Sequence, residues 1–293
     1  MTSLGVVFRP QVPPERLIAA ARAAEEAGLE ELWLWEDCFW GSGIAPAAAA
    51  LASTTRLQVG IGLLPVPFRN PVITAMEFAT LERMFPGRFR PGVGHGVQEW
   101  MEQVGARASS PLTLLREHLD AMRALLRGEE VSRAGRYVKL DRVRLDLPPA
   151  DVPKILAGAV GPKTLKLSGE AADGTILDGQ NSPERVRWAK TQIDEGRAAA
   201  GRTDPHRIVV FTHAATGPGG AERVRREQEA FGNDPGLGVA GGPDDFAALA
   251  AEYLDAGADS LIFTPTADEP EVENFIRFVG REVKPLISRT SVR

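Results

Sequence analysis

Short apolar runs alternate with helix-like segments along almost the whole chain, and this alternation restricts the possible folds more than any other feature. Such a pattern is typical of parallel strands that are joined by crossover helices. Eight apolar runs occur, at Leu4–Phe8, Glu31–Trp35, Leu57–Leu64, Phe89–Gly94, Lys154–Gly158, Gly174–Asp178, Arg207–His213 and Ser260–Thr264. The order predicts an α/β fold, a (β/α)8 TIM barrel, in a single domain over residues 1–293. In such barrels the functional groups lie on the loops that follow the strands.

The segments between the runs carry the punctuation of helices, with proline near the start and glycine just past the end. Helices are expected at Pro14–Ala27, Ala45–Ala52, Pro71–Met84, Thr113–Leu126, Pro162–Ala171, Pro183–Ala200, Ala221–Ala230, Pro243–Ala256 and Glu271–Val283. Two segments interrupt the regular order. Residues Glu130–Leu147, after the fourth helix, alternate as in a small hairpin. The glycine-rich insertion Ala215–Gly242, after the seventh strand, is either a lid or a tolerated insertion.

The charge and composition of the chain argue against several classes of partner. The net charge is -5 with both signs interspersed, which disfavours nucleic acid or a membrane surface as the main partner. No apolar stretch is long enough to span a bilayer, the N-terminus begins as a strand instead of a leader, and Cys38 is the single cysteine. We therefore expect a cytoplasmic protein without disulfides that acts on a small-molecule substrate.

Glycines mark the ends of the third and fourth strands. The third ends in Gly60-Ile-Gly-Leu-Leu-Pro65, a pattern that indicates a bulged wall for an aromatic ring. The fourth ends in Gly92-Val-Gly-His-Gly96 and leads to Glu99 and Trp100. Glycines let the backbone approach a flat ligand, and the polar and aromatic residues after them are placed to touch it. Such glycines also end strands for purely structural reasons, so this tract alone leaves both interpretations open.

Three polar residues stand at strand ends, where a barrel places its chemistry. Asp37, after the second strand, is either a proton-transfer group, a ligand acceptor or a cap for the next element. Cys38 is either a nucleophile or an inert thiol, and nothing near it in the sequence favours the thiolate. His213, at the end of the seventh strand, either faces a ligand or is a satisfied core residue.

The loop after the fifth strand has the composition of a phosphate-binding site. Its tract, Gly158-Ala-Val-Gly-Pro-Lys163, is followed by a second lysine, Lys166. Backbone N–H groups at a helix start favour a phosphate, although the same pattern also begins ordinary helices. The sequence has no His-x-x-x-His, no cysteine pair and no Gly-x-Ser-x-Gly elbow. We therefore predict no metal site, and an organic cofactor that carries out redox chemistry itself.

Together these tracts resemble the bacterial luciferase-like monooxygenase superfamily and, within it, the deazaflavin (coenzyme F-420) dependent oxidoreductases. The resemblance extends from about Leu4 to Phe278. The motifs that carry it are Leu32-Trp-Leu-Trp-Glu-Asp37, Gly60-Ile-Gly62 with Arg69-Asn-Pro71, Gly87-Arg88 to Gly96, Gly158 to Lys163 with Ala172-Asp-Gly174, and Gly241-Gly-Pro-Asp-Asp-Phe246 with Ala256-Gly257. Their order and spacing are more specific than any one of them.

The resemblance implies an oxidoreductase that transfers a hydride between the deazaflavin and a small organic substrate. It also implies a non-prolyl cis peptide at Gly62–Leu63 that supports the ring, and a homodimer. The residues that it places at the cofactor are Cys38, Gly62, Leu63, Gly94, Gly96 and Trp100 near the ring, with Val160, Gly161 and Lys163 at the phosphate. It leaves proton transfer to His95, Glu99 or Asp37.

Two alternatives remain open at this point. One is a monooxygenase of the same superfamily that uses flavin mononucleotide (FMN), oxygen and NAD(P)H. The other is a non-catalytic flavin-binding barrel. Deazaflavin enzymes of this group often carry histidine directly after the acid of the second strand, where this chain has Cys38. This departure leaves both the substrate and the proton donor open.

Overall fold

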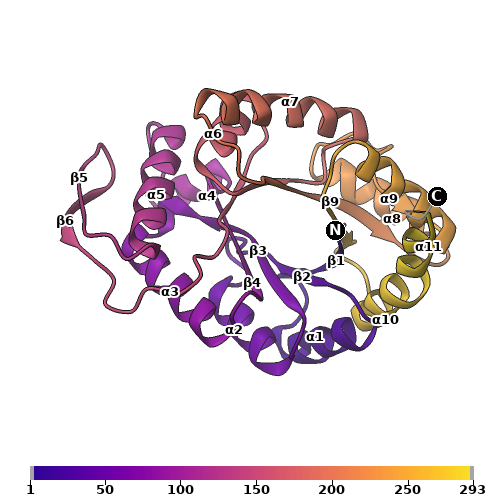
Figure 1. Ribbon diagram of the computed structural model, residues 1–293. Coiled ribbons are helices and arrows are strands. Elements are labelled where there is room, and N and C mark those ends of the chain that lie inside the picture. The colour runs from indigo at the N-terminus through magenta and orange to yellow at the C-terminus, as the bar shows by residue number, and fades with distance from the viewer. Residues whose placement is uncertain (1–2, 291–293) are drawn as a thin grey trace.

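A closed barrel of parallel strands forms the centre of the molecule and is seen along its axis in Figure 1. The computed structural model describes residues 3–290. Within them the barrel strands pair in the order β1, β2, β3, β4, β7, β8, β9 and β11, and β11 pairs with β1 to close the ring. Their bounds are Ser3–Phe8, Glu31–Leu34, Gln58–Pro65, Phe89–Gly94, Leu156–Gly158, Gly174–Leu177, Arg207–Ala215 and Ser260–Pro265. The predicted (β/α)8 TIM barrel is confirmed.

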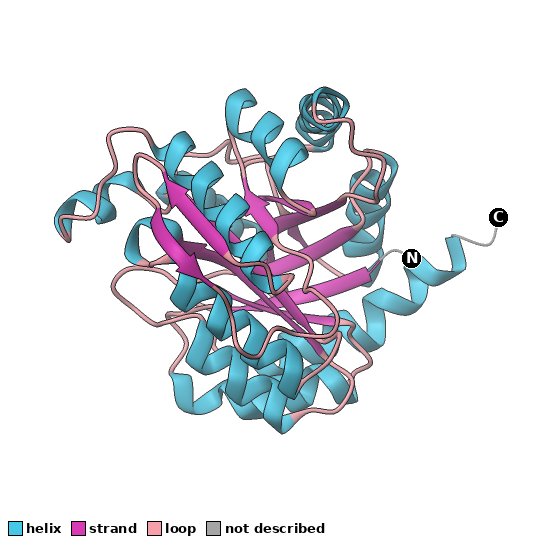
Figure 2. Cartoon of the chain, turned by 60° about the vertical axis from the view of Figure 1, so that its left-hand side comes forward, coloured by secondary structure: helices cyan, strands magenta, loops and turns pink. Residues whose placement is uncertain are grey.

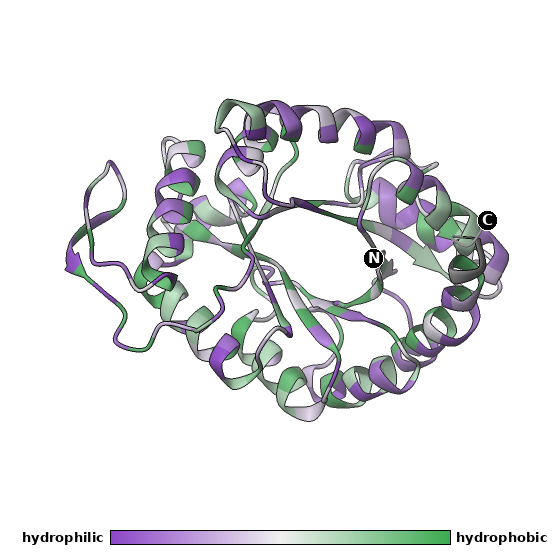
Figure 3. Ribbon diagram, in the orientation of Figure 1, coloured by the Kyte–Doolittle hydropathy of each residue, from purple (hydrophilic) through white to green (hydrophobic). Residues whose placement is uncertain are grey.

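Helices surround the barrel, and each crossover between neighbouring strands contains one (Figures 1 and 2). Hydrophobic and hydrophilic residues alternate around these helices, as the mixed colouring of Figure 3 shows, so each can face the strands and solvent at once. Their bounds are α1 Leu17–Glu26, α2 Ile44–Ser53, α3 Pro71–Met84, α4 Gln98–Gln103, α5 Pro111–Leu126, α6 Pro162–Ala171, α7 Pro183–Ala199, α8 Gly220–Ala230, α9 Pro243–Asp255, α10 Val272–Phe278 and α11 Lys284–Thr290. Short helical turns cover Pro14–Arg16, Val66–Phe68 and Val279–Val283. Within residues 3–290, every helix is too short or too polar to cross a lipid bilayer.

The inside of the barrel is filled by buried side chains from β1, β2, β7, β8, β9 and β11. Trp33 and Phe211 are both buried and meet edge to face, with 5.6 Å between their ring centroids. The indole of Trp33 occupies the space where a Cβ at Gly60 would lie, so this position of β3 has no room for a side chain. The barrel is therefore a packed core below its open end and not a pore.

The two predicted interruptions lie where the sequence places them. The hairpin consists of the antiparallel strands β5, Val131–Ala134, and β6, Lys139–Val143, and it projects from one side of the barrel in Figure 1. The insertion after β9 contains α8 and a short strand, β10, Val239–Ala240, that pairs with β9. The sequence pattern does not predict β10 or α4, because two and six residues are too few to show a period.

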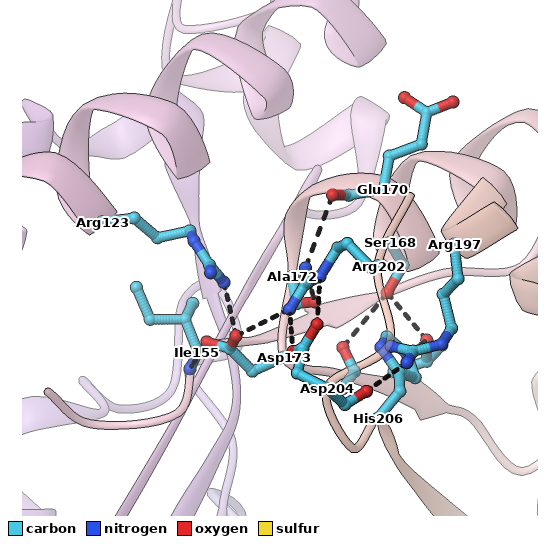
Figure 4. Close-up of polar contacts among 12 residues, drawn as sticks. Arg123, Ile155, Ser168, Glu170, Ala172, Asp173, Arg197, Arg202, Asp204 and His206 are labelled. Atoms are coloured by element: carbon cyan, nitrogen blue, oxygen red, sulfur yellow. Dashed lines mark hydrogen bonds and ion pairs between the residues drawn. The ribbon is translucent and has the colours of Figure 1, made fainter. Parts of the chain in front are cut away.

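A buried carboxylate near the end of α6 binds groups from three other parts of the chain, as Figure 4 shows. Asp173, from the Ala-Asp-Gly motif before β8, binds Arg123 of α5 at 2.5 Å and Arg202 at 3.0 Å, and it accepts the backbone N–H of Ile155 at 3.1 Å. Arg202 also binds the exposed carboxylate of Asp204 at 2.5 Å. Because Asp173 serves three donors from separate elements, its removal leaves several polar groups without a partner.

We expect Asp173→Ala to lower the free energy of unfolding by about 3 kcal/mol, because two arginines lose a buried partner. Asp204→Ala is the matched control, since it removes an exposed carboxylate from the same Arg202 and is expected to cost less than about 1 kcal/mol. Urea unfolding of the two variants and the wild type measures both values. Equal losses from the two variants would show that the Asp173 cluster contributes no more than a surface ion pair.

Candidate active site

A cavity of about 540 Å³ opens at the carboxyl ends of the barrel strands. Its lining comes from the ends of β2, β3, β4, β7, β8, β9 and β11, from one residue each of α4 and α6, and from Phe231 and Asn233 of the insertion after β9. The volume lies in the range of small-molecule and cofactor sites. The end of the barrel at which it opens is the end where barrel enzymes bind their ligands.

One wall of the cavity is a bulge near the end of β3. The peptide bond Gly62–Leu63 is cis, as predicted, and the pairing of β3 with β4 shifts register between Ile61 and Leu64. A Cβ at Gly62 would lie 2.6 Å from the ring of Phe211, so the backbone here rests directly on the packed interior of the barrel. The bulge therefore offers a flat backbone surface to a ligand.

Glycines on the two following strands make room for the side chain of Leu63. A Cβ at Gly94 of β4 would lie 2.5 Å from Leu63, and a Cβ at Gly158 of β7 would overlap the same methyl group. Gly94 therefore shapes the wall through Leu63 and does not itself line the cavity. Three strand ends together hold this side chain against the bulge.

The loop between β7 and α6 supplies free backbone donors. Within residues 3–290, the N–H groups of Val160 and Gly161 have no hydrogen-bond acceptor, and both residues line the cavity. Gly161 caps the ten-residue helix α6, whose N-terminus carries a partial positive charge. This is an arrangement suited to a phosphate or another anion. Thr164, on the first turn of α6, lines the cavity, whereas Lys163 is exposed and does not.

Titratable side chains lie on several sides of the cavity. Burial raises the pKa of the Asp37 carboxyl to about 6, although the nearby charge of Arg9 opposes the shift. Burial also lowers the pKa of His95, although the backbone of Pro111 opposes the shift. The Nε2 of His95 lies 3.2 Å from Thr164 Oγ1. Burial raises the pKa of Asp178 at the end of β8. A carboxyl that titrates near neutral pH is able to give and take a proton.

The predicted site residues divide into those that reach the cavity and those that do not. The residues that line it are Asp37, Gly62, Leu63, His95, Gly96, Trp100, Val160 and Gly161. Cys38 is buried beside it, with a cis peptide to Phe39 and a thiol pKa that burial and the charge of Asp37 raise. Glu99 lies on α4 and is exposed, on a different side of that helix from Trp100. The roles of all these residues stay predictions.

Sequence reasoning missed several residues that line the cavity. Asp178 and Gln180 follow β8, and Trp35 and Glu36 follow β2. Asp178 is the last residue of a predicted strand and Asp37 closely follows one, so the same strand-end argument identifies Asp178. Phe231 comes from the glycine-rich insertion, where no pattern indicates which side chain turns inward.

The fold and the site together define a class of protein. The chain is a (β/α)8 barrel that opens to a ligand cavity at its strand ends, with a cis-peptide bulge on one wall and free N–H groups on another. Within that class it belongs to the luciferase-like monooxygenase family, whose model matches residues 3–256. Membership confirms the predicted superfamily and the prediction of an enzyme of the flavin- or deazaflavin-dependent oxidoreductase class.

Relatives of known activity support this assignment. The chain is 32% identical over 213 residues to 5,10-methylenetetrahydromethanopterin reductase of Methanolobus tindarius, a match that covers 72% of this chain and 64% of the reductase, less than two thirds of its length. It is 28% identical to an F-420-dependent glucose-6-phosphate dehydrogenase of Mycolicibacterium gilvum, over 95% of this chain and 96% of that enzyme. The structure of an F-420-dependent secondary alcohol dehydrogenase with an F-420-acetone adduct superposes with a TM-score of 0.88 at 21% identity, covering 98% of this chain and 99% of that one. The last similarity shows the fold alone.

The raised pKa of Asp37 gives stability a defined dependence on pH. A carboxyl whose pKa is higher in the folded than in the unfolded chain stabilises the fold fully below the unfolded pKa, and this contribution is lost as the pH rises through the folded pKa. Relative to Asp37→Asn, we expect the wild type to lose about 2 kcal/mol of unfolding free energy between about pH 4 and pH 7.5. Denaturant unfolding at several pH values measures the difference. A difference that stays constant with pH would contradict the buried, titrating carboxyl.

Proposed function

We propose that this chain is an oxidoreductase that transfers a hydride between a deazaflavin, coenzyme F-420, and a small organic substrate. The observation that carries the proposal is the pairing, in one cavity, of the cis-peptide bulge at Gly62–Leu63 with the free N–H groups of Val160 and Gly161. A flat ring with a phosphorylated side chain needs both surfaces. The choice of deazaflavin is supported by curated relatives that are named as F-420-dependent dehydrogenases.

The residues around the cavity fit such a group. Val160 and Gly161 would hold the phosphate through their backbone N–H groups at the start of α6. Gly62 and Leu63 would support one face of the ring, and His95, Gly96 and Trp100, which line the same cavity, would contact it. The bound deazaflavin supplies or accepts the hydride, and the protein positions the two reactants and excludes water.

Proton transfer falls to groups that reach the cavity. Asp37 carries a carboxyl whose pKa is raised to about 6, and no hydrogen bond from another side chain holds it among the described residues. His95 also lines the cavity, and one of its ring nitrogens is directed to Thr164. We assign proton exchange to these two residues ahead of Glu99, because the carboxylate of Glu99 is exposed outside the cavity.

The other functions predicted from the sequence remain alternatives. An FMN-dependent monooxygenase uses the same fold, and the FMN complex of a diketocamphane monooxygenase superposes with a TM-score of 0.75 at 18% identity. A non-catalytic flavin-binding barrel is disfavoured by two titratable groups, Asp37 and His95, at one cavity. The homodimer, the cytoplasmic location and the lid function of Ala215–Gly242 also stay predictions.

Titration of the purified protein with coenzyme F-420 and with FMN, followed by absorbance, separates these functions. We expect saturable binding of the deazaflavin and at least about tenfold weaker binding of FMN, a difference of about 1.4 kcal/mol in binding free energy. Tight FMN binding together with oxygen consumption in the presence of NAD(P)H would favour the monooxygenase instead. If cofactor binds but Asp37→Asn and His95→Ala leave every hydride-transfer rate unchanged, the binding-protein interpretation gains.

Gly158→Ala tests the wall that supports the ring. The new Cβ overlaps a methyl group of Leu63, so the leucine must move toward the space assigned to the ring. We expect the deazaflavin affinity to fall about tenfold, while the unfolding free energy changes by less than about 1 kcal/mol, because the end of the leucine side chain can move into the cavity. The double variant Gly158→Ala, Leu63→Ala is expected to recover binding. Gly242→Ala is the matched control, since Gly242 does not line the cavity, has a φ of -93°, and would place its Cβ 4.0 Å from the nearest heavy atom. Equal effects of the two alanines would argue against a role for Leu63.

A further inference from the structure

The lining of the cavity is acidic and lacks a free cation. It includes Glu36, Asp37 and Asp178, and none of the lining residues in the described part of the chain is lysine or arginine. Glu36 is already paired with Arg69 at 2.9 Å. Arg9 lies close enough to Asp37 to affect its pKa, but its guanidinium is 2% exposed and bound to Glu227 at 2.5 Å. The cavity therefore has no unpaired positive side chain for an anionic substrate.

Two side chains on neighbouring strands have buried polar atoms without a hydrogen bond of good geometry in the described part of the chain. His213 of β9 and Thr264 of β11 are register partners in the barrel, and both line the cavity. They are 4% and 1% exposed, yet in residues 3–290 no hydrogen bond of good geometry reaches either ring nitrogen of His213 or the hydroxyl of Thr264. The side chain of Gln228 lies close enough to the ring of His213 to raise its pKa, against the larger lowering by burial. Buried polar atoms are almost always hydrogen-bonded, so an unsatisfied pair beside a cavity indicates a ligand or an ordered water.

The surroundings of His213 hold its ring in one orientation. The ring of Phe231 stacks on it, with 5.5 Å between centroids and 20° between planes, and on another side the ring lies 3.0 Å from where a Cβ at Gly179 would be. Phe231 is itself 55% exposed and belongs to the insertion after β9. An imidazole fixed in this way is arranged for a directional hydrogen bond, which a side chain that merely fills space does not need.

The chemistry of this pair selects uncharged oxygen groups. Burial and the charge of Arg9 lower the pKa of His213, so the ring is neutral and offers one donor and one acceptor. The hydroxyl of Thr264 can donate and accept. A ligand hydroxyl or carbonyl satisfies both residues without bringing a charge into the cavity. A phosphate or carboxylate would face the carboxyl of Asp37 and meet no unpaired cation. An ammonium, which can only donate, would leave the donor hydrogens of His213 and Thr264 without an acceptor.

We infer that His213 and Thr264 form the substrate-recognition pair of this enzyme, and that its substrate carries an uncharged hydroxyl or carbonyl group there instead of a phosphate, carboxylate or ammonium. The inference adds a substrate class to the proposed oxidoreductase function. It rests on that function, because the bound ligand is a substrate only if the protein is this enzyme. It distinguishes this chain from a relative that is named for a phosphorylated sugar. The binding preference itself does not require a particular cofactor.

The test compares ligands that share one carbon skeleton. Cyclohexanol, cyclohexanone, cyclohexyl phosphate and cyclohexylamine are titrated into the cofactor-loaded protein, and binding is followed by the absorbance of the bound deazaflavin. The same four compounds are tested on the cofactor-free protein by thermal shift. We expect the alcohol or the ketone to bind at least about tenfold more tightly than either charged compound, because burying an unpaired charge is far more costly than burying a hydrogen-bonded hydroxyl.

Variants connect the preference to the two residues. Thr264→Val keeps the shape of the side chain and removes its hydroxyl, and His213→Leu removes both ring nitrogens. Each is expected to weaken the uncharged ligand about fivefold, as the loss of one hydrogen bond predicts, and Thr264→Ser is expected to retain wild-type affinity. Thr266→Val is the matched control, because Thr266 has a buried hydroxyl that is also unsatisfied, at 2% exposure, but does not line the cavity. It is expected to leave ligand binding unchanged.

Several results would overturn the inference. Charged compounds that bind as tightly as cyclohexanol would do so, as would failure of both uncharged compounds to bind. Unchanged affinity in Thr264→Val and His213→Leu would show that water satisfies the pair. If the protein binds FMN and not the deazaflavin, the proposed function fails, but the same titrations into FMN-loaded and cofactor-free protein still decide the ligand preference.

Discussion

The packing of Trp33 against Phe211 inside the barrel is the constraint on which the candidate site depends. These two side chains fill the interior so completely that β3 carries glycine at 60 and 62, the positions next to their rings. With no Cβ at Gly62, the backbone of β3 lies directly on the aromatic core, and the bulge that follows becomes a wall of the cavity. A tightly packed interior deforms little. The flat surface offered to a ligand is therefore held by the core of the fold and not by a mobile loop.

The same logic extends around the rim of the barrel. Leu63 turns toward β4 and β7, and both strands carry glycine where its side chain arrives, at Gly94 and Gly158. β7 then passes into the loop with the free N–H groups of Val160 and Gly161, so the bulge of β3 and this loop are connected through one leucine. A change in the bulge would consequently alter both of these parts of the cavity.

The sequence predicted the barrel because its period is repeated eight times, and errors in single elements do not alter the total. It predicted the bulge and the cis peptide because several glycines and a resemblance over the whole chain pointed to the same position.

The sequence was less informative about which helical side chains reach the cavity. Successive helical residues differ by about 100° around the axis, so Thr164 reaches the cavity and Lys163 does not, and Trp100 reaches it where Glu99 does not. Element boundaries accurate to one residue would be needed to distinguish these neighbours, and α4 leaves no periodic trace in the sequence.

The shifted pKa values of the titratable groups at the cavity come from burial, which sequence patterns do not show. Asp37, His95 and His213 have ordinary side chains whose pKa values shift because the cavity removes them from water. That desolvation makes the carboxyl of Asp37 able to exchange a proton near neutral pH. It also makes any additional charge in the cavity costly, since Arg9 is already committed to Glu227. Proton exchange and the preference for an uncharged ligand thus have one physical origin, and a mutation that admits water to this side of the cavity should weaken both together.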